Sequence, residues 1–518
     1  MPIIRTPSVC IAGARLAPVA AIVSLLAACH GGADAHFPSG FFFGAAIAGF
    51  QAEMGCPTLP PARCEDRNSD WYAWITNPTL IAEAGNHIEG DAPARGPGFY
   101  ELYPADLDRL ANELHGNALR TSIEWSRLFP TSTVGINGTA ALRAAASADA
   151  LAYYHALFAA MKARHITPLV TLNHYTLPNW IHDAAGCHAN LDTCSPRGWL
   201  DADTTVNEIA KYAGFCAQEF GGEVDWWATL NEPFTAVVLA GYVMPSATRT
   251  NPPGVNLRWD AAKAAVQAMI RAHNRMADAI HAADTTSAAG DGVAARVGIV
   301  YNLQAVSPAN PDNPLDITGA KNLDYLMNQL FLDGALNGLV DANFDGTQVK
   351  QTDLGGRTDF LGINYYQRLT EEGLSTSAFP NVTPLFTFDP FTLQYSNDVE
   401  GLAGELAFAH SRYHLPMVIS ETGLTDPDDT GAAAEWIQSS LFQARTAISQ
   451  GIDLRGYFFW SLVDNYEWNH GMTMRFGLYA VDGGDTSKAR TARPRAISAF
   501  AQIAKTRAVA APDAGVSP

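Results

Sequence analysis

Asp225-Trp226-Trp227-Ala228-Thr229-Leu230-Asn231-Glu232-Pro233 is the stretch that best defines the fold of this chain. A short apolar run leads directly into polar residues. Runs of four to eight apolar residues bounded by turn or helix signals are typical of strands buried in a parallel sheet. Residues 225–231 are therefore predicted to form a buried strand that ends in a carboxylate.

Seven further runs of this kind occur along the chain, at 41–47, 118–125, 167–173, 296–302, 359–365, 416–421 and 454–461. Segments with helical periodicity lie between them, for example 103–115, 148–164, 204–220, 260–283, 320–338, 430–449 and 494–505. Alternating strands and helices require right-handed crossovers and a parallel sheet, and eight such units can close on themselves. We expect an α/β fold, a single (β/α)8 TIM barrel with extended βα loops, over residues 36–507. The small, Pro-containing tail 508–518 is expected to be disordered.

Composition supports a large core and excludes one class of partner. Of the 518 residues, 47% are hydrophobic, which is enough for a barrel of this size. The 52 acidic and 33 basic residues give a formal charge of −19, and no basic run could follow a phosphate backbone. Nucleic acid is therefore not an expected partner.

The N-terminal segment has the layout of an export signal. Arg5 and Arg15 precede the apolar run 16–26, which is too short to span a bilayer comfortably. The run ends in Leu26-Ala27-Ala28-Cys29, which resembles the bacterial lipobox. We expect residues 1–28 to be a lipoprotein signal peptide and Cys29 to be the lipidated N-terminus of an exported, periplasmic or cell-surface protein that contacts a membrane only through this anchor. A plainly cleaved signal and an uncleaved anchor are the alternatives.

Two local cysteine pairs fit an exported protein. Cys56 with Cys64, and Cys187 with Cys194, lie in loop-like sequence. An oxidising compartment would join each pair, and closing so small a loop stabilises a fold by about 2–3 kcal/mol. Zinc binding is the weaker alternative, because the spacings do not match a zinc knuckle and no histidine cluster lies beside them.

Two strand ends place carboxylates where a barrel carries its active site. Glu232 follows the fourth run and Glu421 ends the seventh, and barrel active sites form at the C-terminal ends of the strands. The two strands lie across the barrel from each other, so both side chains can reach one substrate bond. Glycoside hydrolysis needs such a pair, one carboxyl protonated and one ionised. Taken singly, either residue could be an exposed loop acid.

Other strand ends favour the catalytic interpretation. Arg120, in the second run, would keep a neighbouring carboxylate such as Glu421 ionised. His174 ends the third run, where it would bind sugar hydroxyls or be an ordinary core histidine. Trp460, in the eighth run, would form a platform for a sugar ring or pack in the core.

Several motifs together resemble glycoside hydrolase family 1, from Phe41 to Pro494. They are Gln51-Ala52-Glu53, Ile123-Glu124-Trp125-Ser126-Arg127, Thr229-Leu230-Asn231-Glu232-Pro233, Gly362-Ile363-Asn364-Tyr365-Tyr366, and the segment from Trp460 to Gly477. Within the family the chain is most similar to archaeal-type broad-specificity β-glycosidases. That similarity rests on Ser69-Asp70-Trp71-Tyr72-Ala73-Trp74, Gly90-Asp91 with Gly96-Pro97-Gly98, Leu172-Asn173-His174, and Met474-Arg475-Phe476-Gly477-Leu478.

The resemblance implies a role for each site residue. Glu232 would be the acid/base and Glu421 the nucleophile of a retaining double displacement, with the carboxyl groups about 5–5.5 Å apart. Asn231 would hold the sugar's 2-hydroxyl, and Tyr366 with Arg120 would steady the nucleophile. The residues implied for the non-reducing-end subsite are Gln51, His174, Trp125, Glu467 and Trp468, with Trp460 beneath the ring. No cofactor or metal ion is implied. One departure is Ser420-Glu421-Thr422-Gly423, where the family usually has Thr-Glu-Asn-Gly.

The expected activity is exo-hydrolysis of terminal β-D-glycosyl residues, chiefly β-glucosides and also β-galactosides or β-fucosides. Glu467 favours neutral sugars, because a carboxylate at that position would repel a sugar phosphate. A transglycosylase using the same site is one alternative. A surface sugar-binding lipoprotein without turnover is another, although such a protein would be expected to lose Glu232 or Glu421. The oligomeric state is left open.

Overall fold

The computed structural model describes residues 36–244 and 250–511. The expected signal peptide, Cys29 and residues 512–518 of the expected tail lie outside these ranges. The described residues form one compact unit. Of the tail residues that are described, Ala508 pairs with His36 and Val509 is buried.

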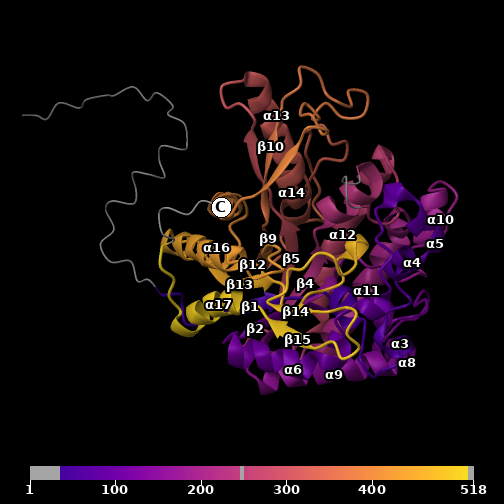
Figure 1. The fold of residues 1–518 in the computed structure, drawn as a ribbon. Helices are drawn as coiled ribbons and strands as arrows, with labels where there is room; N and C mark the ends of the chain where they lie inside the picture. The colour runs from indigo at the N-terminus through magenta and orange to yellow at the C-terminus, as the bar shows by residue number, and fades with distance from the viewer. Residues whose placement is uncertain (1–35, 245–249, 512–518) are drawn as a thin grey trace, which may run out of the picture. The chain divides into compact units, whose positions relative to one another are not determined.

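Eight parallel strands close into a barrel (Figure 1), which confirms the predicted fold class. Their order around the barrel is β1-β13-β12-β9-β5-β4-β3-β2. The strands are β1 (Phe42–Ala46), β2 (Ala118–Ser122), β3 (Thr167–Asn173), β4 (Trp226–Asn231), β5 (Arg296–Asn302), β9 (Phe360–Asn364), β12 (Met417–Thr422) and β13 (Leu454–Trp460). The barrel closes at β1, where Ala46 pairs with Trp460 of β13 on one side and Arg120 of β2 on the other.

Helices follow each barrel strand in sequence. They are α6 (Phe99–Asp108), α9 (Ala148–Ala163), α11 (Ala202–Phe220), α12 (Trp259–Ala283), α13 (Pro314–Asp324) with α14 (Leu330–Asn337), α15 (Gly401–Tyr413), α16 (Ala432–Ser449) and α17 (Pro494–Thr506). π-Helical turns, Arg109–Glu113 and Tyr325–Gln329, extend α6 and join α13 to α14. The segments with helical periodicity form helices, and α15 is additional. Its apolar pattern is interrupted by Gly401 and Gly404, which weakens the helical signal.

Aromatic side chains fill the N-terminal end of the barrel interior. Trp226, near the start of β4, contacts Phe360 with ring centroids 5.0 Å apart and Phe42 at 5.4 Å. Phe42 also contacts Phe458 of β13 at 6.4 Å. Because these rings close the interior at that end, the polar residues at the C-terminal strand ends face the open mouth.

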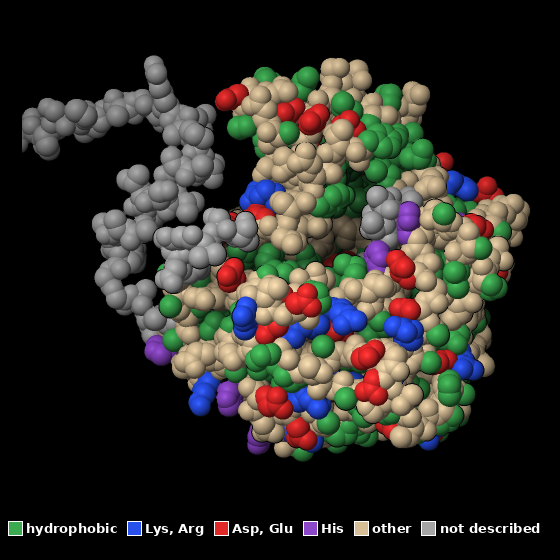
Figure 2. Space-filling model, in the orientation of Figure 1, with side chains coloured by type: hydrophobic (Ala, Val, Ile, Leu, Met, Phe, Trp, Pro, Cys, Tyr) green, Lys and Arg blue, Asp and Glu red, His purple; other side chains and the backbone are tan. Residues whose placement is uncertain are grey.

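The loops at the barrel mouth carry structure of their own. After β1 come α2 (Gly49–Glu53), α3 (Pro61–Cys64), α4 (Asp70–Thr76) and α5 (Pro78–Ala82); α7 (Trp125–Leu128) and α8 (Thr139–Ala145) follow β2; α10 (Ala184–Ala189) follows β3; and a π-helix (Pro233–Val243) follows β4. A separate sheet joins β6 (Ala305–Pro308), β10 (Gln367–Glu371) and β11 (Gln394–Asn397). Two short pairs complete the strands, β7 (Leu339–Val340) with β8 (Val349–Lys350) and β14 (Tyr479–Val481) with β15 (Arg490–Ala492). In Figure 2 the surface is hollowed below the segments of α13 and β10 that project at the top of Figure 1.

Both cysteine pairs are disulfides in the structure. Cys56–Cys64 closes the loop after β1, with Cα atoms 5.9 Å apart, and Cys187–Cys194 closes the loop after β3, at 5.0 Å. Cys216 is buried in α11 as a free thiol. No helix within residues 36–244 and 250–511 is long and apolar enough to cross a membrane.

Candidate active site

Glu232 and Glu421 lie at the mouth of the barrel, each next to an irregularity in its strand. The pairing of β4 with β5 shifts register between Ala228 and Asn231, just before Glu232, which itself has a left-handed φ of 44°. The pairing of β12 with β9 shifts between Ile419 and Glu421. Such irregularities redirect side chains and are common beside active sites. Here they occur where the two carboxylates leave their strands.

The two glutamates differ in environment. Glu421 is 4% exposed, whereas Glu232 is partly exposed. Burial raises the pKa of Glu421, the Arg120 guanidinium opposes this shift, and the Glu232 carboxylate adds to it. The charge of one glutamate therefore acts on the other, which indicates that they face a common space.

Two donors hold the carboxylate of Glu421. Arg120, which is fully buried, forms an ion pair through Nη1 with Oε1. The hydroxyl of Tyr366 donates to Oε2 at 2.8 Å. Burial, with the nearby charge of Glu421, raises the pKa of Tyr366 far above its usual value, so its phenol stays protonated and remains a donor. Both contacts favour the ionised form of Glu421, as a nucleophile requires.

A chain of side-chain hydrogen bonds joins this glutamate to the other. Arg120 Nη2 donates to Asn231 Oδ1 at 2.7 Å. Asn364, at the end of β9, donates through Nδ2 to Asn231 Oδ1 at 3.2 Å and to Glu232 Oε1 at 2.7 Å. Asn364 had no role assigned from sequence, although its place at the end of a predicted strand was a usable signal.

The ring of His174 stacks with those of Trp460 and Trp468. The His174 ring stacks at 6.0 Å from Trp460, with 21° between the planes, and at 6.0 Å from Trp468, with 18°. His174 Nε2 also lies 3.2 Å from Asn231 Nδ2. Stacked apolar faces beside polar nitrogens suit a pyranose, whose C–H faces pack on rings while its hydroxyls need polar partners.

Gln51 and Glu467 meet although 416 residues separate them in sequence. Gln51 lies in α2, after β1, and donates through Nε2 to Glu467 Oε2 at 2.8 Å. Backbone N–H of Tyr466 donates to the Gln51 carbonyl at 2.9 Å, which fixes the two loops against each other. Both side chains are buried and could bind neighbouring sugar hydroxyls together.

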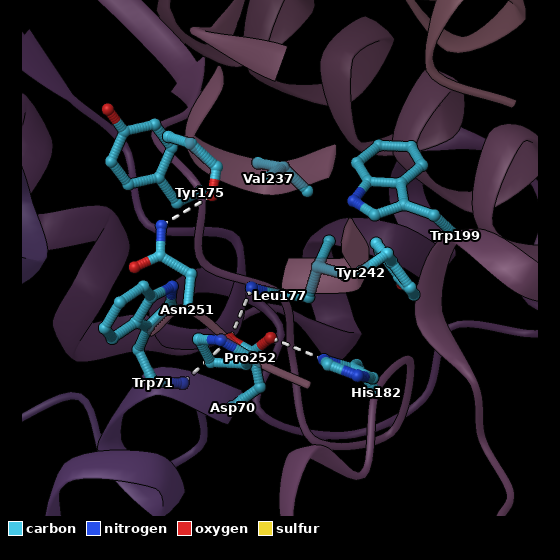
Figure 3. A pocket seen from close by; sticks show the side chains of 11 residues that line it. Asp70, Trp71, Tyr175, Leu177, His182, Trp199, Val237, Tyr242, Asn251 and Pro252 are labelled. Atoms are coloured by element: carbon cyan, nitrogen blue, oxygen red, sulfur yellow. Dashed lines mark hydrogen bonds and ion pairs between the residues drawn. The ribbon is translucent and has the colours of Figure 1, made fainter. Parts of the chain in front are cut away.

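Tyr175 and Trp71 pack against Trp468. Neither was predicted from sequence to belong to the site. Their ring centroids lie 4.8 Å and 4.5 Å from that of Trp468. Both line a small cavity of about 10 Å³ and lie on the same side of it (Figure 3). Asp70 and His182, which line the same cavity, are bonded at 2.7 Å and join the loop after β1 to the loop after β3 (Figure 3).

Trp125, also predicted for the subsite, is buried among other aromatic rings. It is 1% exposed and stacks on Tyr212 at 5.4 Å, with 15° between the planes. It also contacts Trp180 edge-on at 5.4 Å. Its stacking partner lies on α11, so this contact joins α7 to α11.

Within residues 36–244 and 250–511, no group of three or more His, Cys, Asp or Glu side chains is arranged to hold a metal ion.

Comparison with known proteins gives the same family as the motifs. Residues 33–508 match the family described as "Glycosyl hydrolase family 1". A β-galactosidase of Pyrococcus woesei is 33% identical, over 91% of this chain and 98% of the relative. The solved structure of a β-glycosidase from Thermosphaera aggregans superposes with a TM-score of 0.76 and 28% identity, covering 92% of this chain and 98% of that one. A β-glucosidase structure from Pyrococcus furiosus gives a TM-score of 0.74 and 30% identity, with 92% and 97% covered.

The match extends over nearly all the described barrel, including the strand ends that carry both glutamates. On the strength of this match the chain belongs to glycosyl hydrolase family 1.

Proposed function

We propose that this glycosidase hydrolyses terminal β-glycosides by a retaining double displacement, with Glu421 as nucleophile and Glu232 as acid/base. The observation that carries the assignment is that the two carboxyl groups differ in burial and in the charge of their hydrogen-bond partners. Glu421 is buried against the Arg120 cation and the Tyr366 hydroxyl. Glu232 is partly exposed and receives neutral donors from Asn364 and Tyr175. The cation and the hydroxyl stabilise the anionic form of Glu421, as a nucleophile requires, whereas Glu232 has no cationic partner of this kind among the described residues and is partly open to the solvent.

In the first step, Glu421 attacks the anomeric carbon while Glu232 gives its proton to the glycosidic oxygen. The bond from C1 to that oxygen breaks, the aglycone leaves as an alcohol, and a glycosyl ester forms on Glu421. In the second step, a water molecule attacks C1, its proton passes to Glu232, and the ester bond to Glu421 breaks. The two inversions restore the original β configuration.

The aromatic and polar groups around the glutamates position the sugar. Trp460 would lie beneath the ring, His174 would bind hydroxyls, and Asn231 would hold the 2-hydroxyl, whose hydrogen bond strengthens in the transition state. Remote binding of this kind orients C1 toward Glu421 and so contributes to the rate as well as to affinity.

Neutral hexosides are the proposed substrates, with β-glucosides and β-galactosides both accepted. The carboxylate of Glu467, bonded to Gln51, can accept hydrogen bonds from hydroxyl groups but would repel a phosphate on the sugar. The names of the relatives point to the same two sugars, since one is a β-galactosidase and another a β-glucosidase.

We also propose that the enzyme is exported and held at a membrane by a lipid on Cys29. The lipobox-like sequence supports this proposal, as do two disulfides of a kind that persist in oxidising compartments. In a Cys29→Ser variant the protein should move from the membrane fraction to the soluble fraction after cell lysis. Retention of that variant in the membrane would contradict lipid anchoring at this residue.

The test of the activity is a panel of nitrophenyl glycosides given to protein that begins at residue 36, alongside Glu421→Gln. We expect rapid release from β-glucoside and β-galactoside, a loss of several orders of magnitude in the variant, and β-configured sugar as the first product. No release from any β-glycoside by folded protein would favour the sugar-binding alternative. Predominant transfer of the sugar to an added alcohol at low concentration would instead indicate a transglycosylase.

A further inference from the structure

The hydroxyl of Tyr175 lies against the proposed acid/base. It is 2.7 Å from Glu232 Oε2, while Asn364 Nδ2 is 2.7 Å from Glu232 Oε1. Each carboxyl oxygen therefore has a partner of its own. The partners differ in kind, because a phenol can donate or accept a hydrogen bond and an amide nitrogen can only donate.

The orientation of the Asn364 amide follows from its link to Arg120 through Asn231. Arg120 only donates, so the atom of Asn231 that faces it at 2.7 Å is the oxygen. The atom of Asn364 that faces this oxygen at 3.2 Å is then its nitrogen. The same nitrogen faces Glu232 Oε1, so Oε1 is an acceptor.

The acidic proton of Glu232 is thereby assigned to one oxygen. The unprotonated oxygen of a neutral carboxyl group is the better acceptor, and Oε1 is the oxygen that receives the Asn364 N–H. The proton consequently resides on Oε2, against the Tyr175 hydroxyl. That hydroxyl accepts from Oε2–H when Glu232 is neutral and donates to Oε2 when Glu232 is ionised, so it can hold the carboxyl in both states.

The backbone and packing of Tyr175 fit such a role. Its φ is 71°, in the left-handed region that a tyrosine adopts only when its surroundings impose it, and such residues are concentrated at functional sites. Its ring packs against both Trp468, at 4.8 Å, and His174, at 4.9 Å. The hydroxyl is therefore presented to Glu232 by a fixed ring.

We propose that Tyr175 is a positioning residue that keeps the exchangeable proton of Glu232 on Oε2, the oxygen from which it passes to the glycosidic oxygen. The proposal rests on the proposed retaining mechanism. In glycosylation the Oε2–H turns from Tyr175 to the leaving oxygen and gives it the proton, as C1 bonds to Glu421 and its bond to the leaving oxygen breaks. Tyr175 then donates to the ionised Oε2. In deglycosylation the attacking water returns a proton to Oε2 as the bond from C1 to Glu421 breaks.

The experiment is Tyr175→Phe, which removes only the hydroxyl, assayed on two β-glucosides. Methyl β-glucoside has a poor leaving group that needs the proton, whereas dinitrophenyl β-glucoside does not. We expect kcat/KM for methyl β-glucoside to fall by about 10- to 100-fold, less than the full contribution of general acid catalysis because Glu232 itself remains, and kcat/KM for the dinitrophenyl substrate to change by less than about 3-fold. For the dinitrophenyl substrate, kcat should also fall, because deglycosylation uses Glu232 as a base.

Tyr457→Phe is the matched control, because its buried hydroxyl contacts Ser440 on the outer side of the barrel and should leave both rates unchanged. Titration of intact sites with a slow fluoroglycoside corrects for any unfolded protein. Equal losses on the two substrates, or no loss on either, would overturn the positioning role while leaving the proposed function intact. No turnover of either substrate by the wild-type enzyme would overturn both.

Discussion

Tyr366→Phe removes one of the two donors to the nucleophile without changing the shape of the site. The lost bond is the 2.8 Å contact to Glu421 Oε2. A hydrogen bond to a charged group contributes about 1.5–3 kcal/mol, and about 1.4 kcal/mol corresponds to a factor of ten. If this stabilisation is lost in the glycosylation transition state, kcat/KM should fall by about 10- to 150-fold.

The same substitution should alter the pH dependence in a defined direction. The Tyr366 hydrogen bond lowers the pKa of Glu421, whose pKa burial otherwise raises. Its removal should raise that pKa further and move the acidic limb of the kcat/KM profile to higher pH. The assay is kcat/KM for nitrophenyl β-glucoside across the pH range, with Tyr457→Phe as the control. A loss below about 3-fold with an unmoved acidic limb would refute the proposed role of this contact.

Three other predictions follow from charges and cross-links. Glu467→Gln should lower kcat/KM for nitrophenyl β-glucoside and raise the relative rate on the same glucoside phosphorylated at its primary hydroxyl. An unchanged ratio of the two rates would show that Glu467 does not discriminate against phosphate. Replacing Cys56 and Cys64 by Ser should destabilise the fold by about 2–3 kcal/mol, seen as a lower midpoint in urea, whereas an equal midpoint would mean that the cross-link adds no stability. Burial and, less strongly, Asp324 raise the pKa of Glu405 from 4.5 to about 8. The stability this carboxyl contributes is thus fully present below pH 4.5 and is lost as the pH rises through about 8. Glu405→Gln should therefore flatten the decline of the urea midpoint between acidic and alkaline buffers, and a decline as steep as in wild type would contradict this.

The barrel could be predicted from sequence because its signal is local and repeated. Each strand is a short apolar run, and the residue that ends it belongs to the mouth whatever the details of packing. Glu232 and Glu421 were identified for that reason. The sheet of β6, β10 and β11 was not identified, because its strands are short and pair across long stretches of chain, as Arg368 does with Ala305.

The hydrogen-bond partners of the catalytic side chains were harder to predict from sequence. Asn364 and Tyr175 both end or follow predicted strands, but their bonds to Glu232 depend on how neighbouring strands are staggered. The subsite role of Trp125 stays a prediction, because it rests on a motif and the ring contacts of the structure do not test it. In the structure it begins α7 and its ring packs on Tyr212.

The most direct test of the mechanism is to trap the covalent intermediate and find the residue that carries it. A fluoro-sugar with an activated leaving group forms the glycosyl ester quickly and releases it slowly, because fluorine destabilises the second transition state. We expect one fluoroglycosyl group per protein, located by peptide mass spectrometry on Glu421, and no label in Glu421→Gln. Label on another carboxylate, or turnover of β-glycosides with inverted product and no label, would contradict the assignment of Glu421 as the nucleophile.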